Sequence, residues 1–195
     1  MYNIAILLGG DGCFMSRTKT QKIAFAALLG AMTFVATWVS FPTPIGGNVN
    51  LGDCVLLLAA WMPLEPWSIL SCAIGATLTD LAAGYAIYAP ATFVIKALMV
   101  AVAVLIKRGT PKMLRPWRAI LSGLGAEAVM VMGYCAYEAL VLYGVAAFAN
   151  VPFNLVQAGV SLVAATALAA VLSRLPLPEV LRNKNSLFEK GFTKK

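Results

Sequence analysis

The chain has 195 residues, of which 61% are hydrophobic and 12% charged, and its mean hydropathy is +0.83. A soluble domain carries about 25% charged residues, and one of this length cannot bury so much apolar surface, so lipid must solvate part of it. The net charge of +7 does not indicate nucleic-acid binding, because the basic residues flank apolar segments as they do in membrane proteins.

The first fourteen residues are expected to lie outside the membrane domain. They hold a short apolar run but no basic n-region and no small-residue cleavage site, so they do not form a signal peptide. A basic lead follows Met15, and codons for Gly9-Gly10-Asp11 can resemble a ribosome-binding sequence, so we expect translation to start at Met15 rather than at Met1. The predicted organisation is an upstream or disordered extension over 1–14, one membrane domain over 15–178, and a basic cytoplasmic tail over 179–195.

Six apolar segments follow, and each predicts a helix. The second is short, and several fall below the ~20 residues of a simple span, which indicates tilted or protein-buried helices. In chain order the predicted helices cover residues 22–41, 51–62, 67–83, 91–106, 117–143 and 153–175.

Positive charge orients these segments. Of the fifteen Lys and Arg residues, only Lys96 falls in the half that would face outward. The others lie before the first segment, between the fourth and fifth, or after the sixth, and six spans place all three groups in the cytoplasm. The sequence therefore predicts an all-α integral membrane protein with six transmembrane helices and both termini cytoplasmic. The main basic residues are Arg17, Lys19, Lys22, Lys107, Arg108, Lys112, Arg115, Arg118 and those of the tail from Arg174.

Five ionisable residues lie within or at the ends of the apolar segments. Each costs about 2.5–3.5 kcal/mol to place inside a membrane, so together they indicate a polar site rather than decoration. They are Asp53, Asp80, Lys96, Glu127 and Glu138.

Helical spacing groups further polar residues with these. Glu127, Tyr134 and Glu138 share one face of the fifth helix, and Asn154 and Gln157 share one face of the sixth. Two tyrosines at the outer end of the third helix could stack on a flat ring. Structural roles stay open for several of these residues: helix capping for Asp53 and Asn154, an ion pair between Asp80 and Lys96, and an interfacial position for Tyr85 and Tyr88.

The first helix carries two patterns of small residues four apart. They are Ala27 with Ala31 and Ala26 with Gly30, and either permits close approach of another helix, inside this chain or in a partner.

Catalytic and metal-binding motifs are missing from the sequence. It has no histidine, its four cysteines lack CxxC spacing, and it has no GxxxxGK[ST], GxSxG or HExxH motif. We therefore predict no metal, no cofactor and no enzymatic activity, and ATP could power transport only through partner proteins.

Four segments resemble the substrate-binding S components of energy-coupling factor (ECF) vitamin transporters. They are Asn48-Val-Asn-Leu-Gly-Asp53, the block from Asp80 to Lys96 with its Tyr-Ala-Pro-Ala-Thr core, Gly133-Tyr-Cys-Ala-Tyr-Glu138 and Asn154-Leu-Val-Gln157. The central block is most similar to the branch that includes riboflavin, hydroxymethylpyrimidine and pyridoxine carriers.

This resemblance implies a capture subunit in the plasma membrane of a prokaryote. It implies a membrane T component and two cytoplasmic ATPases as partners, with Ala27 and Ala31 on the docking face. We expect hydroxymethylpyrimidine or a B6 vitamer as ligand, with riboflavin next. The predicted substrate site comprises Asn50, Asp53, Asp80, Tyr85, Tyr88, Lys96, Glu127, Tyr134, Glu138, Asn154 and Gln157.

Two other function classes stay open. A self-sufficient proton- or ion-coupled carrier would use Glu127 and Glu138 as a titrating pair. An intramembrane enzyme is the weakest alternative, because the chain lacks histidine and a nucleophile–base pair.

Overall fold

A computed structural model describes residues 17–43, 48–62, 64, 66–109 and 115–173. The predictions for residues 1–14, for the start at Met15 and for the tail 179–195 lie outside these residues. Six α-helices form the described chain, as predicted. In order, the elements are α1 (Arg17–Trp38), β1 (Ser40–Pro42), β2 (Asn48–Asn50), α2 (Gly52–Trp61), α3 (Trp67–Ala82), α4 (Ala89–Gly109), α5 (Arg115–Tyr137), a π-helical turn (Glu138–Leu142), a 3₁₀ segment (Gly144–Asn150) and α6 (Val151–Leu172).

A short β-hairpin replaces the end predicted for the first helix. The helix was expected to reach residue 41, but it ends at Trp38, and Phe41 pairs with Val49 in an antiparallel ladder. Pro42 cannot continue a helix because its ring clashes with the preceding turn. The hairpin carries the chain from α1 to the start of α2.

The fifth helix also departs from its prediction. It was expected to be continuous to residue 143, but its last turn, Glu138–Leu142, is π-helical and runs into the 3₁₀ segment. Gly144 makes the turn with φ 57°, a conformation that glycine adopts without steric cost. Single π turns are frequent at functional sites.

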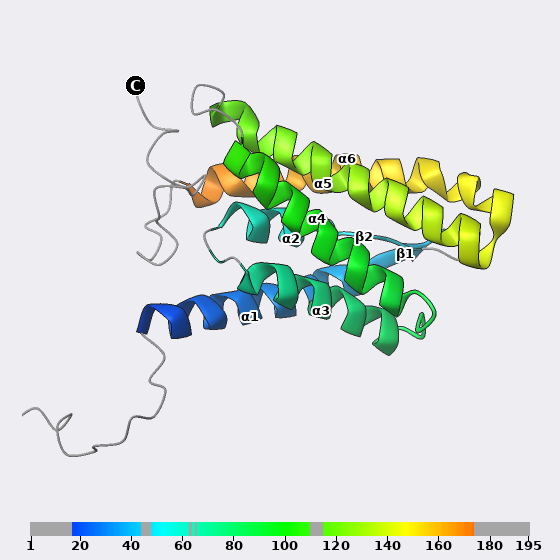
Figure 1. Cartoon of the computed structure of the whole chain (residues 1–195), viewed down its shortest axis with the longest axis horizontal. Helices are drawn as coiled ribbons and strands as arrows, with labels where there is room; N and C mark the ends of the chain where they lie inside the picture. The colour runs from blue at the N-terminus through cyan, green and yellow to red at the C-terminus, as the bar shows by residue number, and fades with distance from the viewer. Residues whose placement is uncertain (1–16, 44–47, 63, 65, 110–114, 174–195) are drawn as a thin grey trace, which may run out of the picture.

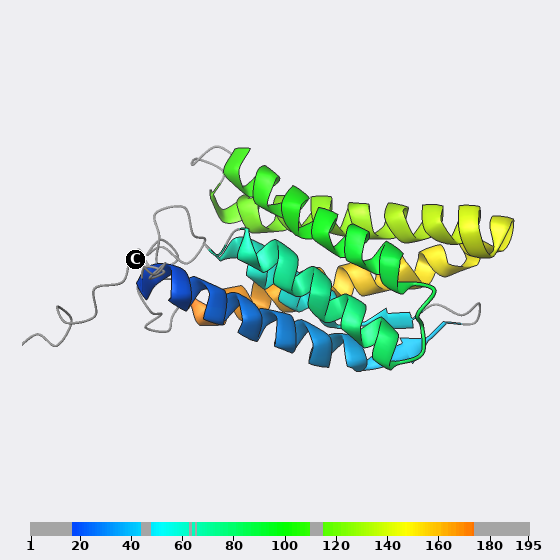
Figure 2. The same ribbon diagram turned by 60° about the horizontal axis from the view of Figure 1, so that its bottom comes forward.

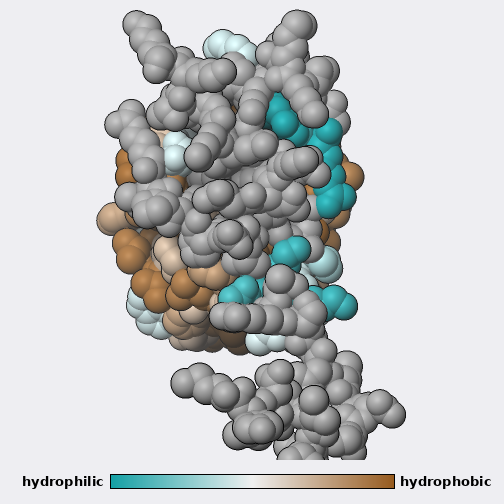
Figure 3. Space-filling model, turned by 90° about the vertical axis from the view of Figure 1, so that its left-hand side faces the viewer, coloured by the Kyte–Doolittle hydropathy of each residue, from teal (hydrophilic) through white to brown (hydrophobic). Residues whose placement is uncertain are grey.

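The helices run side by side along the long axis of the molecule (Figures 1 and 2). We call the end that holds β1 and β2 the hairpin end, and the opposite end, where α1 begins and α6 ends, the terminal end. Helix α4 ends and α5 begins at the terminal end as well (Figure 1), so the described basic residues other than Lys96 gather there. Figure 3 looks at the terminal end and shows hydrophilic residues on it and hydrophobic residues on the flanks. The described basic residues there include Lys19, Lys22, Lys107, Arg108 and Arg118.

The flanks of the bundle are apolar. Large aliphatic side chains such as Leu105 and Val163 are 64% and 68% exposed, which fits contact with lipid rather than water. Within the described residues, four segments are long and apolar enough to cross a membrane: Lys19–Trp38, Ala89–Arg108, Trp117–Leu142 and Gly144–Leu172. Helices α2 and α3 are shorter. The count of six spans and the cytoplasmic position of the termini remain predictions.

Helix α2 is the centre of the bundle. All ten of its residues are buried, and at 1.5 Å per residue it covers only about half of a ~30 Å hydrocarbon core. The C-terminal end of α2 is capped by Lys107, whose Nζ donates to the Ala60 carbonyl at 2.6 Å. The indole N–H of Trp61 donates to the Ser122 hydroxyl at 2.8 Å. The lysine satisfies one of the last carbonyls of α2, which have no partner within the helix, and the serine satisfies the buried indole N–H. The opposite end of α2 points toward the hairpin end.

The two small-residue patterns of α1 face in different directions. Ala26 and Gly30 are buried, and a Cβ on Gly75 of α3 would collide with the Gly30 carbonyl oxygen. This pattern therefore packs α1 against α3 inside the chain. Ala27 and Ala31 lie on the exposed side of α1, where another molecule can reach them.

Candidate functional site

A pocket opens at the hairpin end of the bundle. The space between its lining atoms is about 460 Å³, with open solvent at its mouth included. Most of its lining residues were predicted from the sequence, and they come from six elements and the α3–α4 connection. The lining consists of Asn48, Asn50, Asp80, Tyr85, Tyr88, Thr92, Tyr134, Glu138, Asn154 and Gln157.

Tyrosines form one wall of the pocket. The rings of Tyr85 and Tyr88 meet edge to face, with centroids 6.3 Å apart and an interplanar angle of 71°. Tyr88 makes a second such contact with Tyr137, at 5.9 Å and 60°. Tyr134, on α5, also lines the pocket, and its hydroxyl shares a hydrogen bond with the Thr92 hydroxyl at 3.1 Å. Rings held by such contacts offer a rigid surface on which a flat ligand can stack.

Glu138 is the buried carboxylate of the pocket. The Tyr88 hydroxyl donates to its Oε1 at 3.3 Å, and the Asn150 amide donates to its Oε2 at 3.0 Å. Burial raises the pKa of the Tyr88 phenol above its usual value, so this group stays a neutral donor. Glu138 is 3% exposed, and the π turn that begins at this residue sets the position of its side chain.

A second polar cluster lies directly behind the pocket. Lys96 Nζ is 2.5 Å from Asp53 Oδ1, and Gln157 Nε2 donates to Asp53 Oδ2 at 2.5 Å. The amide of Gln157 also accepts from the Asn50 backbone N–H at 2.8 Å. Asp53 and Lys96 are fully buried. This cluster therefore joins α2, α4, α6 and the end of β2 through one carboxylate and one amide.

The geometry corrects three structural interpretations of the sequence. Lys96 pairs with Asp53, so the Asp80–Lys96 ion pair that the sequence left open is not formed among the described residues. Asp53 does not cap α2, since it lies in the first turn and both its oxygens are bound elsewhere. Asn154 does not cap α6, because that helix begins at Val151 with Asn150 at the cap position.

Two polar atoms in the pocket wall are left without a hydrogen-bond partner among the described residues. Asp80 Oδ2 is an acceptor and Asn154 Nδ2 is a donor. Buried polar atoms are rarely left unpaired, so a ligand that offers one donor and one acceptor would complete this wall.

The remaining predicted site residues do not all reach the pocket. Asp53, Lys96 and Glu127 lie behind its lining. Glu127 is buried, and neither of its carboxylate oxygens has a hydrogen-bond partner in the described chain.

Three residues that the sequence analysis passed over belong to the site. Thr92 lies four residues before Lys96, so helical spacing could have placed it on the same face. Asn48 could have been found from its place in the motif that ends at Asp53. Asn150 carried no comparable signal, since its bond to Glu138 depends on the turn at Gly144.

Comparison with known proteins identifies the family. Residues 17–174 match the family described as ECF-type riboflavin transporter, S component, and the match covers the whole described bundle. No curated protein gives a significant match to the chain. Such S components are membrane subunits that bind the substrate of a transporter, and they are not enzymes. The resemblance inferred from the sequence is thus confirmed, and the chain belongs to the S components of the ECF-type riboflavin transporter family.

Proposed function

We propose that this S component captures a small, flat, water-soluble vitamin in the pocket at the hairpin end and delivers it across a prokaryotic plasma membrane. The observation that carries the proposal is the pocket itself, whose lining combines three tyrosines, a buried carboxylate and four amide side chains. A heterocycle with ring nitrogens and hydroxyl groups offers matching donors and acceptors.

Riboflavin is the first ligand to test. The family description names riboflavin, whereas the sequence-based preference for hydroxymethylpyrimidine or a B6 vitamer gains no support from it. All three are flat heterocycles, so the tyrosine wall alone does not separate them. In this proposal Asp80 and Asn154 bind the ligand directly, and Tyr85 and Tyr88 stack on its ring.

Mass spectrometry of the detergent-purified protein tests the ligand class. We expect a flavin or another flat vitamin to co-purify, and denaturation should release it. An amino acid, sugar or lipid in the pocket instead would refute the proposed class.

The proposed transport partners are a membrane T component and two cytoplasmic ATPases. Ala27 and Ala31 form an exposed small-residue strip on α1, which suits close approach by a partner helix. Replacing both with leucine should abolish ATP-driven uptake and leave ligand affinity unchanged, because the strip lies outside the pocket lining. The control is Leu28→Ala, which shortens a side chain on the same exposed surface of α1. This variant should transport normally. Normal uptake by the double variant would remove this docking face from the proposal.

The alternative is a self-sufficient carrier driven by an ion gradient. Glu127 and Glu138 are both buried acids, which is the observation in its favour. Purified protein in liposomes separates the two classes. Uptake driven by a proton or sodium gradient without ATPases would favour the carrier, and uptake only with the ATP-hydrolysing partners supports the S component mechanism.

A further inference from the structure

The lining of the pocket holds two acids and, among the described residues, no basic side chain. The acids are Asp80 and Glu138, and the other lining residues are amides, tyrosines and one threonine. Glu138 is buried and accepts hydrogen bonds from two neutral groups, the Tyr88 hydroxyl and the Asn150 amide. Asp80 Oδ2 has no hydrogen-bond partner in the described part of the chain. The negative charges of the lining are therefore not balanced by a cation in the pocket wall.

Lys96 does not supply this cation. Its Nζ lies 2.5 Å from Asp53 Oδ1, its side chain is 2% exposed, and it is not among the lining residues. The sequence has no other lysine or arginine at residues 23–106 and none at residues 119–173, and it has no histidine. All lining residues fall within these two stretches. A negatively charged ligand group would therefore meet two carboxylates without a counter-charge from the wall.

We propose that the pocket selects its ligand by charge: it accepts a vitamin that is uncharged or cationic and rejects the phosphate monoester of the same vitamin. This inference rests on the proposed function and deepens it, since it concerns the ligand of the same pocket. Asp80 and Glu138 cause the rejection, because like charges brought together at a binding site oppose association and a buried charge without a partner is strongly unfavourable. A hydroxyl or ring N–H of an unphosphorylated vitamin would instead donate to Asp80.

Helix N-termini are the competing feature, because they attract anions. Helices α2, α4 and α6 begin at the hairpin end, and each N-terminus is equivalent to roughly half a positive charge. The first turn of α2 already holds a carboxylate, Asp53. The second residue of α4 is Pro90 and that of α6 is Pro152, and a proline has no N–H to offer. We therefore expect the two full charges of Asp80 and Glu138 to outweigh these partial charges.

Calorimetry of the full chain in detergent tests the selection with matched pairs of probes. The pairs are riboflavin with riboflavin phosphate, pyridoxine with pyridoxine phosphate, and hydroxymethylpyrimidine with its phosphate monoester. For each vitamin that binds, we expect its ester to bind at least about 100-fold more weakly. An ester that binds within about tenfold of its parent vitamin would overturn the inference and leave the proposed function standing.

The ratio of the two affinities separates the effect of charge from the loss of a contact. Asp80→Asn/Glu138→Gln keeps the shape of both side chains and removes both charges. It should weaken binding of the vitamin and bring the ester to within about tenfold of it. If this double variant does not fold, Asp80→Asn alone should still lower the ratio. The matched control, Asn154→Ala, removes a polar group of the lining without a change of charge, so it should weaken both probes and leave their ratio unchanged.

Two results with these variants would contradict the role of the acids. One is a ratio that stays at the wild-type value in the charge variant, and the other is a ratio that falls equally in the control.

The charge of the ligand that co-purifies with the protein tests the inference separately from the proposed function. An uncharged or cationic ligand that is not a flat vitamin would refute the proposed function and support the selection by charge. A phosphorylated or carboxylated ligand would overturn the selection by charge, even if that ligand is a flat vitamin.

Discussion

Two buried carboxylates of this protein differ in their position and in their partners. Asp53 is held by a cation and an amide behind the pocket, and each of its oxygens accepts a hydrogen bond. Glu138 lines the pocket and is held by a phenol and an amide. The first carboxylate is locked into the packing of four elements, whereas the second remains in contact with the space that a ligand would fill.

This difference predicts that Asp53 contributes mainly to stability and Glu138 mainly to ligand binding. A buried ion pair fixes the relative position of the helices that carry it, and removing one partner is strongly unfavourable. A carboxylate with neutral partners can exchange one of them for a ligand group at a smaller cost. Stability should therefore depend on the cluster of Asp53, Lys96 and Gln157, and ligand affinity on Glu138.

The largest expected effect comes from Lys96→Met, which removes the cation of the Asp53 cluster. We expect the free energy of unfolding to fall by about 3–5 kcal/mol, because Asp53 is left buried without a counter-charge. Unfolding in detergent, followed by circular dichroism, gives the value. Leu98→Ala on the exposed side of the same helix is the control and should change stability far less. A loss no larger than that of the control would show that the ion pair does not hold the helices together.

Gln157→Ala should affect both properties. Its amide donates to Asp53, accepts from the Asn50 N–H and also lines the pocket. We expect about 1–3 kcal/mol less stability, since the change leaves buried groups unpaired. We also expect a tenfold to hundredfold weaker affinity, estimated from about the same free energy. Unfolding and calorimetry with the identified ligand measure the two effects. A change in stability alone would make Gln157 a structural residue, and a change in affinity alone would make it a ligand-binding residue only.

Glu138→Gln should weaken binding and leave stability almost unchanged. The neutral amide keeps the shape and can still accept from Tyr88, but it loses the charge, so affinity should fall by roughly tenfold to hundredfold. The free energy of unfolding should change by less than about 1 kcal/mol. A strongly destabilised Glu138→Gln protein would contradict the division between the two carboxylates.

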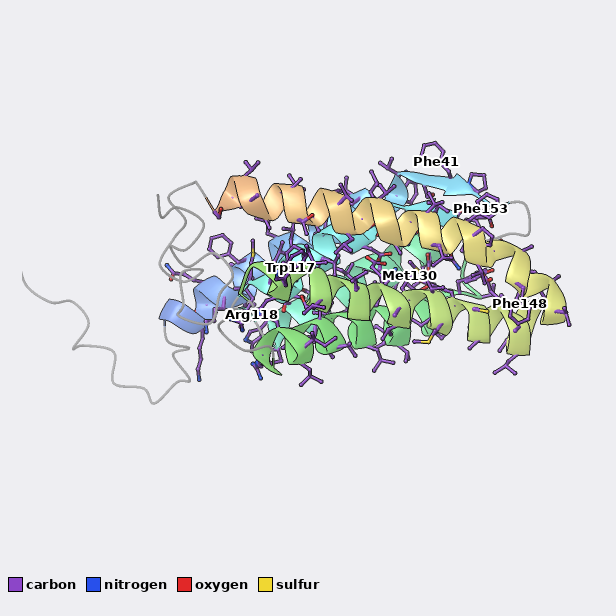
Figure 4. The ribbon with its side chains drawn as sticks, turned by 90° about the horizontal axis from the view of Figure 1, so that it is seen from above. Phe41, Trp117, Arg118, Met130, Phe148 and Phe153 are labelled. Atoms are coloured by element: carbon purple, nitrogen blue, oxygen red, sulfur yellow. The ribbon has the colours of Figure 1, made fainter. Side chains whose placement is uncertain are left out.

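The smallest effect is expected for Phe148→Ala. Figure 4 shows this residue at the far tip of the α5–α6 connection, away from Trp117 and Arg118 at the terminal end. Its side chain is 61% exposed and does not line the pocket. Stability should stay within about 0.5 kcal/mol of wild type, and the calorimetric affinity should not change. A marked loss of binding would extend the site to this turn.

The sequence predicted the helices better than the contacts between them. Apolar segments and charge placement are local signals, so the six helices and the short α2 were foreseen. The partner of Lys96 was not, because the hairpin that starts at Ser40 delivers Asp53 to the face of α4, and three-residue strands leave no clear periodicity. The two small-residue patterns of α1 differ by one position, and only packing showed that Gly30 faces α3 while Ala31 does not.

Most residues of the pocket lining were likewise predicted. The sequence did not show which polar residues lie in the lining and which lie behind it. Polar residues in apolar segments are rare enough to stand out, so Asp80, Glu138 and Gln157 were found without a structure. Their depth depends on the tilt and packing of the helices, which the spacing does not encode. Asp53, Lys96 and Glu127 were therefore grouped with ligand-binding residues, although they lie behind the pocket lining.

The most direct test of the account is calorimetric titration of riboflavin into the purified wild-type protein and into Glu138→Gln. The account predicts saturable binding to the wild-type protein with one ligand per chain, and an affinity at least about tenfold weaker in the variant. Equal affinity in two folded proteins would contradict the assignment of Glu138 to the ligand site. Absence of binding by riboflavin, hydroxymethylpyrimidine and the B6 vitamers alike would contradict the central claim that this pocket captures a flat vitamin.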